Sequence, residues 1–115
     1  MQDKTLLKIS IFTSIVGIVA LYFIMQPSEI RIGDINRDYI GKTVKVLGEI
    51  SSKYESKNGH IFLKLADSSG EISVVIFNNT KVERNLEIGQ MIEISGEIEE
   101  YKGELEIILK TIAIL

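Results

Sequence analysis

The stretch from His60 to Phe77, HIFLKLADSSGEISVVIF, decides the fold that this chain can adopt. Two alternating apolar runs flank the turn signal Asp67-Ser68-Ser69-Gly70, and this pattern predicts a β-hairpin. With these four residues in the loop, three cross-strand pairs are wholly aliphatic: Leu65 with Ile72, Leu63 with Val74 and Ile61 with Ile76. Because side chains alternate across a strand, the six lie on one face, which we expect in the core.

The other face of this hairpin carries aromatic and basic side chains. The same register sets His60 against Phe77, Phe62 against Val75 and Lys64 against Ser73. Exposed aromatic rings beside a lysine suit stacking on nucleic-acid bases, with the cation near a phosphate. The alternative is that Phe62 and Phe77 pack under a neighbouring helix or a partner protein.

From Lys42 onward the chain is a succession of β patterns. We expect five strands, over residues 43–54, 60–66, 71–77, 91–101 and 104–115. Lys102-Gly103 predicts a tight hairpin between the last two, and the long connection 78–90 has room for a turn or short helix over Val82, Leu86 and Ile88. Gly48 and Gly96 interrupt long strands, as expected where a strand coils sharply to close a barrel.

Three strands, a connector and two further strands indicate an all-β, five-stranded Greek-key barrel, since a sandwich normally needs about seven strands. Such a small domain closes around a modest core. We expect that core to contain Val44, Val46, Ile50, Ile61, Leu63, Leu65, Ile72, Val74, Ile76, Ile92, Ile94, Ile98, Leu105, Ile107 and Leu109.

The N-terminal segment has the character of a transmembrane α-helix. Leu6 to Met25 contains one charged residue, Lys8, and its twenty residues span about 30 Å as a helix, which matches a bilayer core. A cleaved signal peptide is the alternative, but no small-x-small pair precedes Gln26. We therefore expect three units: an N-terminal membrane anchor over 1–26, a connector over 27–41 and the barrel over 42–115.

The charges leave the orientation of this segment open, because Lys4 and Lys8 lie on its N-terminal side and Arg31, Arg37 and Lys42 follow it. A short N-terminal tail before a first span usually stays in the cytoplasm. We therefore expect a single-pass membrane protein with an extracytoplasmic barrel. The chain has no cysteine, which excludes a disulfide framework and a thiolate metal site.

The run from Gly41 to Leu109 resembles the oligonucleotide/oligosaccharide-binding fold (OB-fold) of class II aminoacyl-tRNA synthetase anticodon-binding domains and archaeal single-strand-binding proteins. The matching segments are GKTVKVLGEI, FLKLADSSGEISVVIF and LEIGQMIEISGEIEEYKGELEI. In the synthetases the phenylalanine of an F-x-x-L-x-D strand stacks on a base, and Phe62 holds that position. Where those relatives use an arginine and a glutamine, this chain has Lys53 and Ser73, so the resemblance implies sequence-tolerant stacking.

A second resemblance is to the haem chaperone of cytochrome c maturation, which also has an N-terminal span before a small barrel of this fold. Its lead-in resembles Pro27 to Ile30. In that family a histidine and a tyrosine in a tail beyond the last strand serve haem attachment, and neither follows here before Leu115. We therefore expect no haem and no other cofactor, while an extracytoplasmic carrier or assembly role stays open.

The charge is unevenly distributed. The chain has a net charge of −3, although most nucleic-acid binders are basic. Residues 42–64 are net +3 and residues 87–106 are net −6, so a nucleic-acid strand would lie across the first three strands. We expect contacts from Phe62, Phe77, His60, Lys64, Lys45, Lys53 and Lys57, and from Tyr101 and Lys102 at the far loop. The alternative for the lysines is an ordinary solvated face.

Signals for catalysis and metal binding are poor. His60 is the only histidine and has no nucleophile or acid partner nearby in sequence. The last hairpin sets Glu99 opposite Glu106 and Tyr101 opposite Glu104, which predicts a solvated acidic ridge or, alternatively, a weak site for a hard cation.

We therefore expect a non-enzymatic, membrane-anchored module that binds single-stranded nucleic acid. The alternatives are an interaction or assembly module whose partner docks on Phe62 and Phe77, and an oligosaccharide binder, which the absence of tryptophan disfavours.

Overall fold

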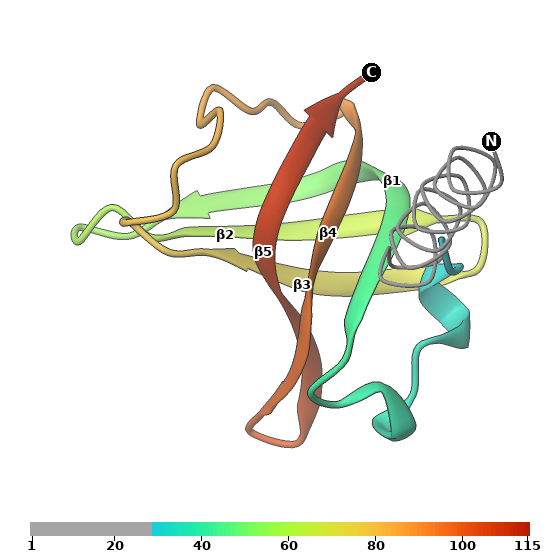
Figure 1. The fold of residues 1–115 in the computed structure, drawn as a ribbon. Helices are drawn as coiled ribbons and strands as arrows, with labels where there is room; N and C mark the ends of the chain where they lie inside the picture. Colours follow the sequence, from blue (N-terminus) through green and yellow to red (C-terminus); the bar gives the residue numbers. More distant parts are fainter. Residues whose placement is uncertain (1–28) are drawn as a thin grey trace, which may run out of the picture.

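The computed structural model describes residues 29–115, which form a closed five-stranded barrel (Figure 1). Two single-turn 3-10 helices come first, η1 (Ile32–Asp34) and η2 (Arg37–Tyr39). The strands are β1 (Thr43–Glu55), β2 (Ile61–Asp67), β3 (Gly70–Ile76), β4 (Met91–Tyr101) and β5 (Glu104–Ile114). Their order around the barrel is β1-β2-β3-β5-β4, with β4 closing onto β1. The five predicted strands are confirmed, with bounds that differ by at most one residue.

The expected anchor over Leu6 to Met25 lies outside the described residues. Within residues 29–115, no helix has the length and apolar character needed to cross a membrane. The connection 78–90 contains turns and bends, so the short helix that the sequence allowed there does not form.

The hairpin of β2 and β3 has the register that the sequence predicts. Its inward pairs join Ile61 to Ile76, Leu63 to Val74 and Leu65 to Ile72. Its outward pairs join Phe62 to Val75 and Lys64 to Ser73. The period of two therefore sorts aliphatic side chains into the barrel and aromatic and polar ones onto its surface.

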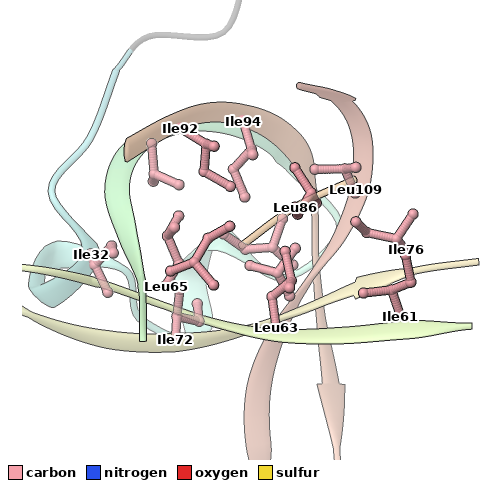
Figure 2. Packing of buried hydrophobic residues seen from close by; sticks show 14 of the residues in the cluster. Ile32, Ile61, Leu63, Leu65, Ile72, Ile76, Leu86, Ile92, Ile94 and Leu109 are labelled. Atoms are coloured by element: carbon pink, nitrogen blue, oxygen red, sulfur yellow. The ribbon is translucent and has the colours of Figure 1, made fainter. Parts of the chain in front are cut away.

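The core is aliphatic (Figure 2). All predicted core residues are buried except Leu105, which is partly buried against the cluster. Two further residues belong to this cluster: Ile32 from η1 and Leu86 from the connection between β3 and β4. Segments outside the strands therefore supply part of the apolar interior.

Close packing of the barrel depends on Gly96. The pairing of β4 with β5 shifts between Ser95 and Gly96, where β5 carries one extra residue, Lys110. A Cβ atom at position 96 would come within 2.6 Å of Ile107 Cγ2 and closer still to the Ile108 carbonyl oxygen. Only glycine lets the two backbones approach this closely without displacement.

The carboxylate of Asp67 fastens η1 to the turn between β2 and β3. Its Oδ1 accepts hydrogen bonds from the backbone N–H groups of Ser69 (2.7 Å) and Gly70 (3.1 Å). Its Oδ2 accepts one from the backbone N–H of Ile32 (2.9 Å). Burial alone would raise the pKa of Asp67, but the hydrogen bonds from Ser69, Ile32 and Gly70 outweigh burial and lower the pKa below its usual 3.8.

We expect the substitution Asp67→Asn to lower the free energy of unfolding at neutral pH by about 1 kcal/mol. An amide keeps one acceptor oxygen for the turn but directs N–H donors at the N–H of Ile32. Because the folded pKa of Asp67 is depressed, its contribution is complete above the unfolded value and is lost as the pH falls through the folded value.

Urea unfolding from about pH 7 down to pH 2.5 measures this effect. The difference between wild type and variant should shrink once the pH falls below the ordinary carboxyl pKa of 3.8. The matched control is Asp38→Asn, an exposed aspartate on η2. A difference that stays constant over the whole range would contradict the role of the ionised carboxylate.

Candidate nucleic-acid interface

The candidate site is the outer surface of β2 and β3 and its continuation onto the neighbouring strands. Two rows of side chains cross this surface. The aromatic row runs from β1 to β5 through Tyr54, Phe62, Val75 and Ile108. The polar row runs from β2 to β4 through Lys64, Ser73, Glu106 and Glu99.

A groove of about 320 Å³ lies over these rows, between the surface of β2 and β3 and the arm formed by β4 and β5. Figure 1 shows this arm projecting from the barrel in a different direction from the hairpin of β1 and β2. The groove is lined by Phe62, Val75, Phe77, Glu99, Glu100, Tyr101, Glu106 and Ile108. Val75 is 5% exposed and forms its floor, whereas Phe62 and Phe77 are 41% and 40% exposed.

The aromatic rings support one another. The centroids of Tyr54 and Phe62 lie 6.2 Å apart, and His60 meets Phe77 edge-on at 5.6 Å. His60 is held by its Nδ1 atom, which accepts a hydrogen bond of 3.1 Å from the backbone N–H of Asn78. The rings at this end of the site are therefore placed before any ligand arrives.

An irregularity in β1 determines which of its side chains reach this surface. The pairing of β1 with β2 shifts between Ile50 and Ser52. The shift places Tyr54 beside Phe62, whereas Lys53 pairs with Leu63 and donates a hydrogen bond of 2.8 Å to the Leu86 carbonyl. Lys53 therefore faces away from the aromatic row, contrary to its expected position. Tyr54 joins the row instead, which the alternation of an unbroken strand does not predict.

The other predicted lysines are dispersed. Lys64 lies in the polar row and pairs with Glu71 at 3.6 Å. Lys45 pairs with Glu93 on β4 at 3.1 Å and does not line the groove. Lys57 is exposed in the loop between β1 and β2. At the tip of the arm formed by β4 and β5, Lys102 Nζ lies 5.3 Å from the Tyr101 ring centroid.

The structure thus brings Phe62, Phe77, His60, Lys64 and Tyr101 to one surface and places Lys57 and Lys102 near its ends. A second groove, of about 380 Å³, extends the surface past Lys64.

Carboxylates form one wall of the aromatic groove. Glu100 pairs with Arg37 at 2.8 Å. A hydrogen bond to Glu97 raises the pKa of Glu99, with burial and the charge of Glu97 adding to the effect. The predicted pairing of Glu99 with Glu106 is confirmed. The acidic ridge that the sequence indicated is therefore part of the site.

The guanidinium of Arg84 binds backbone carbonyls of two loops, the one between β1 and β2 and the one after β3. Its Nη1 donates a 2.9 Å hydrogen bond to the Gly59 carbonyl, and its Nη2 donates to the carbonyls of Phe77 and Thr80. The contact with Gly59 joins residues 25 apart in sequence, and no local pattern indicates it.

Within residues 29–115, no three histidine, aspartate or glutamate side chains are placed together so that they could hold a metal ion.

Comparison with known protein families identifies the family of this barrel. The family model for the tRNA anticodon type of OB-fold nucleic acid binding domain matches residues 44–115. The chain belongs to this family. Among solved structures, asparaginyl-tRNA synthetase from Pyrococcus horikoshii is similar with a TM-score of 0.69 and 17% identity, over 78% of this chain and 23% of that one. The expected resemblance to a synthetase OB-fold is confirmed for the fold.

Curated relatives include two kinds of enzyme. The chain is 34% identical over 84 residues to the tRNA 2-agmatinylcytidine synthetase TiaS of Pyrococcus horikoshii, covering 70% of this chain and 19% of that protein. It is 38% identical over 73 residues to the exodeoxyribonuclease 7 large subunit of Helicobacter hepaticus, covering 60% and 18%. The OB-fold chain therefore spans about a fifth of the length of these relatives.

We expect Arg84→Lys to accelerate amide hydrogen exchange at Asn78 and in the loop 56–60, because one ammonium cannot reproduce the contacts of a guanidinium fork. The free energy of unfolding should fall by about 1 kcal/mol. Hydrogen exchange followed by mass spectrometry or NMR measures both regions.

The matched control is Arg37→Lys, which alters the guanidinium bound to Glu100 on the other arm. It should leave exchange in the loop 56–60 unchanged. Equal protection of that loop in Arg84→Lys and wild type would contradict the role of the Arg84 hydrogen bonds in holding the loop.

Proposed function

We propose that this chain is a binding module for single-stranded nucleic acid, in which bases stack on the aromatic row. The observation that carries the proposal is the pair of half-exposed rings, Phe62 and Phe77, in a groove on the outer surface of an OB-fold nucleic acid binding domain. Flat aromatic rings beside an apolar floor accept the face of any base, so stacking here is tolerant of sequence.

The expected affinity is modest. Stacking contributes about 1–3 kcal/mol per base, and association costs several kcal/mol. Two bases on Phe62 and Phe77 then correspond to a dissociation constant near 0.1 mM or weaker for one copy. Lys57, Lys64 and Lys102 are the cations available to phosphates at this surface, so the salt dependence should be shallow, with a slope of about −2.

We propose a purely binding role, which the side chains at the site support. The only histidine, His60, uses its Nδ1 as an acceptor for the Asn78 backbone, so that nitrogen is occupied. The groove wall is built from glutamates beside aromatic rings, without a serine or threonine nucleophile among the lining residues. We therefore assign the module no catalytic step.

We further propose that Leu6 to Met25 anchors the barrel in a membrane as a single span, with the barrel on the extracytoplasmic side. The support is the sequence of that segment, which has one charge in twenty residues. Several anchored copies on one surface would bind one strand with an effective concentration that offsets weak single-site affinity.

We expect Phe62→Ala to weaken binding of labelled single-stranded DNA and RNA by about five- to a hundredfold, since it removes one stacking surface. Fluorescence anisotropy with the full chain in mild detergent, at low and moderate salt, measures this. The control is Ile88→Ala, which removes an apolar side chain that is 67% exposed outside the groove. Absence of binding at about millimolar concentrations of folded wild-type protein would overturn the proposed binding of single-stranded nucleic acid.

We expect a reporter phosphatase that is active only outside the cytoplasm to be active when fused after Leu115, and the fusion to sediment with membranes. A fusion that lacks residues 1–26 should lose both properties. Activity of a reporter that works only inside the cytoplasm would reverse the proposed orientation, and a soluble full-length fusion would overturn the anchor.

A further inference from the structure

The groove contains a carboxylate that the protein does not pair. Glu100 pairs with Arg37, and Glu99 lies beside a second carboxylate, that of Glu97. Glu106 lines the same groove, yet among residues 29–115 its carboxylate has no hydrogen-bond or ion-pair partner. Burial raises the pKa of Glu106, and the nearby charge of Glu104 raises it further. A partly buried carboxylate without donors carries a desolvation cost that a ligand offering N–H groups would relieve.

The position of Glu106 matches the edge of a stacked base. Phe62 on β2, Val75 on β3 and Ile108 on β5 stand side by side in the aromatic row, and Glu106 lies next along β5. Neighbouring strands are about 4.8 Å apart and successive residues about 3.3 Å. Two strand spacings and a two-residue offset along β5 therefore separate the backbones of Phe62 and Glu106 by about 12 Å. A base that stacks on Phe62 over the floor of Val75 can therefore direct its edge toward Glu106.

Charge determines which part of a nucleotide enters. Of the residues that the structure describes, no lysine or arginine lines this groove, and three glutamates do. The one cation of the polar row, Lys64, does not line this groove and lies 3.6 Å from the carboxylate of Glu71. A phosphate would be repelled from such a groove, whereas the N–H edge of a base is complementary to it. The base, rather than the backbone, is thus the part that fits.

We propose that this groove prefers guanine, with the two carboxylate oxygens of Glu106 accepting hydrogen bonds from the N1–H and the 2-amino group. This inference rests on the proposed binding of single-stranded nucleic acid. Guanine alone presents two adjacent N–H donors on its Watson–Crick edge. Adenine and cytosine place a ring nitrogen acceptor beside their amino group, and the N–H of thymine or uracil lies between two carbonyl oxygens, so each would set an acceptor against the carboxylate.

The test uses a series of oligothymidylates that carry one central guanine, inosine, adenine or cytosine, bound to the full chain in mild detergent at low salt. Guanine should bind about tenfold more tightly than adenine, cytosine or thymine, because a bidentate pair supplies discrimination of that order. Inosine, which keeps N1–H but lacks the 2-amino group, should fall between them.

The variant Glu106→Gln distinguishes recognition from general electrostatics. Removing a negative charge should slightly tighten binding of the oligonucleotides without guanine. Loss of the carboxylate acceptor should weaken binding of the guanine oligonucleotide and abolish the preference for it. The matched control is Glu87→Gln, an exposed glutamate in the connection between β3 and β4 that does not line the groove. It should retain the preference for guanine.

Each further outcome decides between the hypotheses. Binding of all oligonucleotides with equal affinity overturns the guanine inference and leaves the proposed function standing. A preference for guanine that persists in Glu106→Gln overturns the role of Glu106. If folded wild-type protein binds no oligonucleotide but binds an arginine-rich peptide, and Glu106→Gln weakens that binding, both proposals fail and the groove recognises a cationic protein segment.

Discussion

The register of the hairpin formed by β2 and β3 is the constraint on which the rest of the structure depends. The turn at Asp67 sets that register, and Asp67 also holds η1 against the barrel. A slip of one residue would expose Leu63 and bury Phe62 and Lys64, because strand side chains alternate with a period of two. One carboxylate therefore links closure of the core to presentation of the aromatic row.

Local patterns suffice for the strands because each strand carries its own alternation and each tight turn its own residues. Lys102 and Gly103 both have positive φ angles, as a two-residue hairpin loop requires. Local patterns do not predict the burial of Ile32 and Leu86, since these residues enter the core from segments without a periodic pattern. Their burial depends on where distant strands leave space, which no local window contains.

Local patterns likewise predict part of the candidate site. Phe62, Phe77 and His60 follow from one hairpin, and they lie together. Lys53 and Tyr54 exchange places because a single irregularity in β1 inverts the alternation beyond it, and no residue of that strand marks the irregularity. Summing charge along the chain finds the acidic segment but not its place at the site, because β5 returns beside β3 in the folded barrel and carries Glu106 there.

This arrangement separates the two parts of a nucleotide. Aromatic side chains and carboxylate acceptors occupy the groove, while Lys57 and Lys102 lie near its ends, so base and backbone meet different surfaces. Residues 27–115 are net −4, which repels a polyanion at long range. The Debye length is about 10 Å at 0.1 M salt, so salt screens this repulsion as well as the few phosphate contacts. The two effects oppose each other, and stacking becomes the dominant contribution to affinity at physiological ionic strength.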